Sequence, residues 1–276
     1  RIQGTGVAPR SVYYSVGQNT NDHKTGSPTL TITGGAGVFS VAQTAVNMGV
    51  GDRVTYNSSS IAYVAGKIST SIWTLATAQG GMPADVTNAV VDSIAHEYAS
   101  LREAVSGADD ANHLDTSDLT LGYILNVPCY YDSGPGSNAV YVGGWTTASN
   151  NFINIYTPNN TASECNQSQR HAGKWSTNAY RLEIQNMGDG CVFWINTPYV
   201  RITGLQISYD NGGSGGYGIM VSWVNHEGVD ISCCILREIS AVKNAYGIFV
   251  GDWAEKCRIW NNIIDGFNVG ISSKWG

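Results

Sequence analysis

The chain has 276 residues and a net charge of −6 at pH 7, and only 13% of its residues are charged, about half the share in an ordinary globular domain. No basic stripe is available to displace counterions from a phosphate backbone, so nucleic acid is not expected as a partner. No apolar run approaches the roughly 20 residues of a membrane helix, and membrane insertion is not expected either.

Residues 1–90 are predicted to form a β-rich N-terminal segment. The first 35 residues are rich in turn formers. The next 45 contain four short apolar runs typical of a β-meander, at residues 37–42, 53–56, 61–65 and 71–75. Each run is bounded by Gly, Asn or Ser, as the ends of strands usually are.

The only convincing helix pattern covers residues 92–106. Its apolar side chains recur at intervals of 4, 3 and 4 residues, at Ile94, Tyr98, Leu101 and Val105. Such spacing places them on one helical face, and the glycine at position 107 is a candidate C-cap. The sequence therefore predicts a helix and a following loop over residues 91–117.

Residues 118–276 are predicted to consist of strands and turns. Early strands are expected at residues 123–127, 139–142, 151–156 and 180–184. The polar stretch 157–176 is expected to leave these strands as a long loop. From residue 180 onwards the pattern becomes periodic.

Two interleaved motifs repeat with a shared period in this last part. Glycine-led strands begin at Gly190, Gly218, Gly247 and Gly270, with spacings of 28, 29 and 23 residues. The second motif occupies residues 200–207, 229–236 and 257–264, with spacings of 29 and 28 residues. A period of 20–50 residues indicates a repeat architecture.

Aligning the second motif brings like residues into columns, and Ile202, Ile231 and Ile259 form one of them. Parallel rungs that stack one coil apart would bury such columns, because no single rung can bury its own apolar face. The step from Asn261 to Asn262 is expected to be a corner, since a side-chain amide can bond to a tight turn.

These rungs resemble the right-handed parallel β-helix repeat proteins of the pectate-lyase-like superfamily. The resemblance is specific over residues 180–276 and looser over 118–180. It implies an all-β right-handed parallel β-helix, or solenoid, that follows the β-rich segment. The predicted helix is similar to the α-helix that caps the N-terminal end of such solenoids. The last rung begins at Gly270 and is expected to be incomplete, which would leave a sheet end open to association.

The superfamily contains lyases, glycosidases and non-enzymatic adhesins and virion proteins, so the resemblance does not fix the function. The hydrolase branch carries Asn-x-Asp, Asp-Asp, Gly-His-Gly and Arg-x-Lys motifs on consecutive rungs. This chain has an Asp-Asp pair only at Asp109 and Asp110, outside the rungs, and it lacks the last two motifs. The non-enzymatic branch is therefore favoured.

The weak catalytic candidates are Asp230, Arg258 and Arg201, which the alignment places in one outward column. They would form either a clamp for an acidic sugar or a ladder of ion pairs between rungs. Exposed ion pairs contribute about 0.2–1 kcal/mol each, and the ladder is the favoured interpretation.

Three tryptophans, Trp194, Trp253 and Trp275, are candidates for binding glycans, because each falls at or just after a glycine-led strand. An outward aromatic face can stack on a sugar ring. Their offsets from the leading glycine are 4, 6 and 5 residues, however, so packing at the corners of the coil is the favoured interpretation.

No metal motif is present, and no cofactor is expected, although calcium is compatible with the acidic loop that contains Asp109, Asp110 and Asp115. A solvated loop is the favoured interpretation. The six cysteines allow either disulfides or buried thiols. Cys233 and Cys234 are predicted to lie within one strand and to face opposite ways.

The sequence therefore predicts a structural or adhesive β-helix protein that is extracellular or lies on a cell or virion surface. Its expected partners are further copies of itself, in an oligomer or fibre, and polysaccharides. The alternative is a polysaccharide lyase or glycoside hydrolase that acts on an extracellular polysaccharide.

Overall fold

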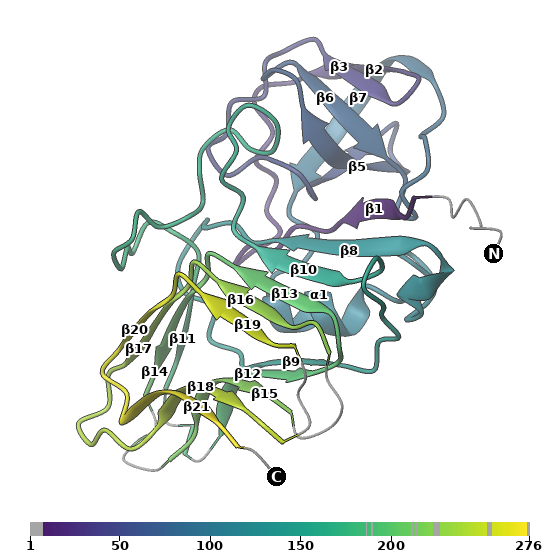
Figure 1. Ribbon diagram of the computed structural model, residues 1–276. Coiled ribbons are helices and arrows are strands. Elements are labelled where there is room, and N and C mark those ends of the chain that lie inside the picture. Colours follow the sequence, from purple (N-terminus) through teal and green to yellow (C-terminus); the bar gives the residue numbers. More distant parts are fainter. Residues whose placement is uncertain are drawn as a thin grey trace, which may run out of the picture.

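The computed structural model describes residues 8–185, 187–188, 190–210, 212, 215–222, 227–252 and 256–274 (Figure 1). This part of the chain is almost entirely β-structure, with one α-helix, α1 (Leu101–Gly107), and a single 3₁₀ turn at Leu119–Leu121. None of its helices is both long enough and apolar enough to span a membrane.

Three parallel sheets make up the lower part of the molecule in Figure 1. The first contains, in order, β1 (Arg10–Tyr13), β8 (Tyr123–Pro128), β10 (Ile153–Tyr156), β13 (Val200–Thr203), β16 (Asp230–Ser232) and β19 (Arg258–Trp260). The second contains β11 (Arg181–Ile184), β14 (Gln206–Tyr209), β17 (Ile235–Glu238) and β20 (Ile263–Asp265). The third contains β9 (Val140–Gly143), β12 (Cys191–Asn196), β15 (Tyr217–Val221), β18 (Tyr246–Val250) and β21 (Val269–Ser273).

From β10 onwards the chain visits the first, second and third sheets in turn, so each coil adds one strand to every sheet. The arrangement is compatible with a β-helix or solenoid. The strand register confirms two of the predicted columns: Ile202, Ile231 and Ile259 in the first sheet, and Ile207, Leu236 and Ile264 in the second. The side chains of both columns belong to one continuous apolar core or pack against it.

The glycine-led motif aligns less well than the sequence predicts. Gly218 and Gly247 are equivalent, because Tyr217 lies opposite Tyr246. The register of the preceding coil, however, places Tyr217 opposite Cys191. The predicted equivalence of Gly190 and Gly218 is therefore wrong by two residues.

The corner between the first and second sheets needs a left-handed backbone in three successive coils. Gly204 has φ +81°, Cys233 φ +54° and Asn261 φ +55°. Cys233 and Cys234 therefore lie at a corner and not within a strand, which corrects the prediction. The predicted asparagine corner is confirmed by the left-handed backbone of Asn261, and Asn262 Oδ1 accepts a hydrogen bond from the amide of Cys234 at the corner of the neighbouring coil. All six cysteines are free.

The N-terminal segment forms a closed barrel that contains only part of the predicted meander: the strands at 53–56, 60–67 and 72–76 pair in sequence, whereas the strand at 36–39 pairs with the strand at 72–76. Its strands are β2 (Thr29–Thr33), β3 (Ala36–Phe39), β6 (Ile72–Ala76), β5 (Ser60–Lys67), β4 (Arg53–Tyr56) and β7 (Val86–Ala95), in that order around the barrel. They enclose a second apolar core. In Figure 1 the barrel lies above the parallel sheets.

The barrel is inserted into the first coil. Strand β1 belongs to the first parallel sheet, and the chain leaves this sheet at Gly17 and returns at Tyr98, whose carbonyl oxygen accepts a hydrogen bond from the Gly17 amide. The predicted helix at 92–106 is partly wrong, because its first residues complete β7. The helix α1 that does form contacts β9, the edge strand of the third sheet.

Two pairs of neighbouring residues make a charged joint where the barrel meets the first coil. Asp52 immediately precedes β4 and Arg53 begins it, whereas His96 and Glu97 immediately follow β7. His96 Nδ1 is 2.8 Å from Asp52 Oδ1, and Arg53 Nη1 is 3.5 Å from Glu97 Oε1. The two pairs have separate partners: Asp52 contacts His96 and His23, whereas Glu97 contacts Arg53 and His113.

Beside Glu97, His113 is held between two carboxylates. Its Nε2 is 3.0 Å from Glu97 Oε1 and its Nδ1 is 2.7 Å from Asp110 Oδ1. Burial alone would lower the pKa of His113, but the hydrogen bonds to Glu97 and Asp110 outweigh burial and raise it above the ordinary value. The charged imidazolium is therefore the stabilised form.

This arrangement predicts a loss of stability at alkaline pH. Because the pKa of His113 is higher in the folded than in the unfolded protein, its contribution is complete below the unfolded value of about 6.5 and is lost as pH rises through the folded value. We expect urea midpoints to fall between pH 6 and 9, and to fall less in His113→Gln. An equal decline in the two proteins would contradict this assignment.

The stacked columns predict a second difference in stability. Ile231→Ala should lower the free energy of unfolding by about 2–5 kcal/mol, since it leaves a cavity in the shared core. Asp230→Ala, the neighbouring outward position on the same strand, removes a surface ion pair and should cost no more than about 1 kcal/mol. Urea denaturation of the two variants measures both values, and similar losses would argue against the stacking.

Candidate functional site

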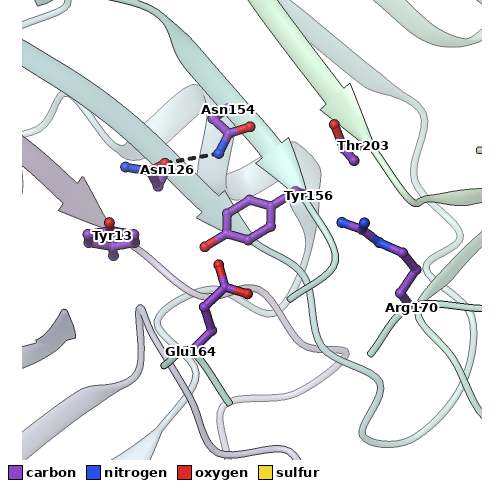
Figure 2. A pocket seen from close by; sticks show the side chains of 7 residues that line it. All are labelled: Tyr13, Asn126, Asn154, Tyr156, Glu164, Arg170 and Thr203. Carbon is purple, nitrogen blue, oxygen red and sulfur yellow. Dashed lines mark hydrogen bonds between the residues drawn. The ribbon is translucent and has the colours of Figure 1, made fainter. Parts of the chain in front are cut away.

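A pocket of about 370 Å³ lies on the outer face of the first sheet, near the barrel (Figure 2). It is lined by Tyr13, Asn126, Asn154, Tyr156, Glu164, Arg170 and Thr203. These side chains are aromatic or polar, and they come from four strands or their ends and from one long loop.

The floor of the pocket is an outward column of the first sheet. Tyr13 lies opposite Asn126, and Asn126 lies opposite Asn154. Asn154 Nδ2 donates to Asn126 Oδ1 at 3.0 Å, and Asn126 Nδ2 donates to the carbonyl oxygen of Val12 at 3.2 Å. Strand register and these amide hydrogen bonds therefore fix the positions of the floor side chains.

The wall of the pocket comes from residues 157–176, which we call the strap. The strap leaves the first sheet after β10 and returns to the coils before β11. On the barrel side, Lys67 N donates to Ser163 O at 2.9 Å. On the coil side, His171 Nε2 is 2.8 Å from the carbonyl oxygen of Cys233, and Ser176 N donates to Gln206 Oε1 at 2.6 Å. The strap thus bridges the barrel and the coils.

Glu164 on the strap brings a carboxylate to the pocket. Its Oε2 accepts hydrogen bonds from the amides of Asn159, at 3.2 Å, and Asn160, at 3.0 Å. Figure 2 shows its carboxylate facing the hydroxyl end of Tyr156. Burial, and then the charge of Glu164, raise the pKa of Tyr156 well above its ordinary value. The phenol therefore stays protonated and can donate a hydrogen bond.

Arg170 lies on the other side of Tyr156 (Figure 2). Its Nη2 donates to the carbonyl oxygen of Thr157 at 3.1 Å, and its Nε is 3.4 Å from Thr157 Oγ1. Gly204 makes room for this side chain: a Cβ at Gly204 would lie 2.5 Å from Arg170 Nε and 2.4 Å from Thr157 Oγ1. Gly204 thus allows the left-handed backbone of the corner and leaves the space that the Arg170 side chain occupies.

The three charged residues that the sequence placed in one column are aligned as predicted, with Arg201 opposite Asp230 and Asp230 opposite Arg258. Asp230 accepts two hydrogen bonds from Arg258. Arg201 Nε is 3.9 Å from Asp230 Oδ2, and its guanidinium lies 3.5 Å from the centre of the Phe152 ring. The column continues from the pocket floor, because Asn154 lies opposite Arg201.

Among the tryptophan candidates, Trp253 and Trp275 lie outside the described residues. Trp194 lies within β12, is 39% exposed on the outer face of the third sheet and so does not occupy a corner. Its ring packs edge-to-face against Tyr141 at 5.2 Å. Trp194 is therefore on a different sheet from the pocket.

The acidic loop candidates are not gathered into a metal site. Asp110 Oδ1 bonds to His113 and to the amide of Asn112, which places it in the joint. In the part of the chain that the structure describes, no group of three or more His, Cys, Asp or Glu residues, Asp109 and Asp115 included, is arranged to hold a metal ion.

The sequence reasoning missed the pocket. A signal for its floor was present, since Leu125-Asn126-Val127 and Ile153-Asn154-Ile155 repeat an apolar-Asn-apolar pattern at a spacing of 28 residues, the period of the coils. No comparable signal marks Glu164 or Arg170, because the strap lies outside the repeat. Comparisons with protein-family models, curated proteins and solved structures give no match.

The role of Gly204 can be tested against a matched glycine. Gly144 has φ +84°, close to that of Gly204, but a Cβ added there would meet nothing within 4 Å. Gly144→Ala should cost about 1–2 kcal/mol of stability from the left-handed backbone alone. Gly204→Ala should cost more, because it also displaces Arg170 and Thr157. Urea denaturation measures the difference, and equal losses would contradict the close packing.

Proposed function

We propose that the protein is a structural or adhesive right-handed parallel β-helix, of the pectate-lyase-like kind, that binds a polysaccharide in the pocket on its first sheet. We propose an extracellular, cell-surface or virion-surface location. The observation that carries the proposal is the pocket itself, in which tyrosines, asparagines, a carboxylate and an arginine converge on a rigid floor.

The chemistry of the lining suits a sugar. A sugar ring offers apolar C–H faces to aromatic rings and hydroxyl groups to amides and carboxylates. Tyr13 and Tyr156 supply the aromatic surface, whereas Asn154 and Glu164 supply the polar groups. The volume of about 370 Å³ falls within the usual range of small-ligand sites, so one or two sugar units would fit.

Binding without cleavage is favoured over glycoside hydrolysis. Most glycosidases need two carboxyl groups about 5–5.5 Å or 6.5–9.5 Å apart. Glu164 is the one carboxylate among the described residues that line this pocket. Asp230, two strands from Asn154 in the outward column, is engaged by Arg258.

A binding panel tests the proposal. Polygalacturonate and alginate serve as acidic polymers, and dextran and xylan as neutral ones, with affinity measured by calorimetry. Asn154→Ala and Arg170→Ala should each weaken binding about tenfold, the effect of about 1.4 kcal/mol. Trp260→Ala, 56% exposed on the same sheet but outside the pocket, is the matched control and should bind as the wild type does.

The same samples separate the alternatives. Failure of every polymer to bind, or binding that both pocket variants leave unchanged, would contradict the proposal. New reducing ends alone in the incubated polymers would indicate a hydrolase, and unsaturated products would indicate a lyase. Mass photometry of the unliganded protein would show whether it also assembles with itself into oligomers or fibres.

A further inference from the structure

A tight turn at residues 49–52 lies between the barrel and the strap. Asp52 closes it twice: its amide donates to the carbonyl oxygen of Gly49 at 3.3 Å, and its Oδ2 accepts from the Gly49 amide at 3.0 Å. The Asp52 side chain is fully buried. The conformation of the turn therefore depends on this carboxylate.

The turn holds the strap by a short antiparallel ladder. Val50 N donates to Glu164 O at 2.8 Å, and Asn166 N donates to Met48 O at 3.0 Å. Between them, Gly49 lies opposite Cys165, and a Cβ at Gly49 would lie 2.6 Å from the carbonyl oxygen of Glu164. The turn thus sets the backbone position of Glu164, whose carboxylate lines the pocket.

The same turn is docked onto the first coil. Tyr130 Oη donates to the carbonyl oxygen of Val50 at 2.8 Å, and Ser15 N donates to Gly51 O at 3.0 Å. Gly51 has φ +91°, and a Cβ there would lie 2.5 Å from the Ser15 amide nitrogen. Barrel, coil and strap therefore meet at these four residues.

Two histidines share the Asp52 carboxylate. His96 Nδ1 is 2.8 Å from Oδ1, and His23 Nε2 is 3.1 Å from Oδ2. The His96 ring also stacks on Tyr130, with the ring centres 5.0 Å apart. The carboxylate that closes the turn is thus within hydrogen-bond distance of both imidazoles, one at each oxygen.

Other groups face the histidines from each packed element. From the coil, Asp132 Oδ2 is 3.8 Å from His96 Nε2, and Ser15 Oγ is 3.4 Å from His96 Nδ1. From the barrel, Asn47 Nδ2 is 3.4 Å from His96 Nε2. Beside His23 on its own segment, Asp22 is paired with Lys24.

We propose that Asp52, with His23 and His96, positions the strap, and that closure of the strap over the pocket depends on the protonation of His23. Asp52 is a positioning residue, because it acts on Glu164 through the 49–52 turn. The inference rests on the proposed function only in treating the pocket as the ligand site.

The direction of the pH effect follows from the local charges. Burial would raise the pKa of Asp52, but the charges of His96 and His23 hold it well below its ordinary value. Burial alone would lower the pKa of His23, but Asp52, with Asp22 and Asp132, raises it above the ordinary value. The paired state is therefore complete below about pH 6.5 and is lost as pH rises through the folded pKa of His23.

Opening of the strap can be measured without any glycan. Hydrogen exchange of peptides from residues 157–176, corrected for the intrinsic pH dependence of exchange, reports opening at pH 6 and pH 9. Tryptic cleavage after Arg170 and Lys174 gives a second measure. We expect the wild-type strap to open several-fold more at pH 9 than at pH 6.

Asp52→Asn keeps the shape of the side chain and removes its charge. It should open the strap about tenfold or more at pH 6 and flatten the pH dependence, because a hydrogen bond to a buried charge is lost. His23→Gln is the milder variant, since His23 lies near the edge of the cluster, and it should reduce the pH dependence while the coils stay folded.

His113→Gln is the matched control, because it breaks the separate charged cluster of Glu97, His113 and Asp110. It should lower stability but leave strap exchange and its pH dependence as in the wild type. Wild-type exchange that does not change with pH, or an Asp52→Asn strap as protected as the wild type, would overturn the inference. Neither outcome bears on the glycan panel, so the two proposals fail separately.

Discussion

The structure depends on one constraint, the parallel register between successive coils. A coil of about 28 residues cannot bury its own apolar face, so each coil must place its strands directly beside those of its neighbours. Side chains alternate across a strand, and the register that aligns Ile202 with Ile231 inside the core also aligns Arg201 with Asp230 outside it. The core thereby fixes the spacing of every polar group on the outer faces.

Two insertions break this regularity, and the pocket forms where they meet. The barrel interrupts the first coil, and the strap interrupts the coil that contains β10 and β11. The outward column of the first sheet supplies a floor of asparagines, which any coil could carry. The groups that distinguish this pocket, Glu164 and Arg170, both come from the strap. The charged groups of the pocket thus come from the irregular part of the chain, and its floor comes from the repetitive part.

The same division explains what the sequence could predict. Apolar residues in the repeats must stack on the equivalent residues of the neighbouring coils. Their columns and the asparagine corner could therefore be predicted. The helix prediction failed at its start because the spacing of four residues between Ile94 and Tyr98 is accidental. Ile94 packs in the barrel core, whereas Tyr98 lies against the coils. Leu101 and Val105 do share a helical face, and there the prediction was right.

The 49–52 turn shows why the strap could not be placed from sequence. Residues from the barrel, the first coil and the strap converge on it, and His96 lies 81 residues along the chain from the Ser15 hydroxyl beside it. Breaking a buried, hydrogen-bonded ion pair costs more stability than forming it provides, because the remaining charge is left in a poorly solvated site. Such a cluster acts as a constraint on geometry. Apolar packing also links barrel and coils, since Tyr63 of β5 belongs to the core of the coils, and the directional hydrogen bonds of Asp52 restrict their relative orientation further. This restriction helps to set the shape of the pocket.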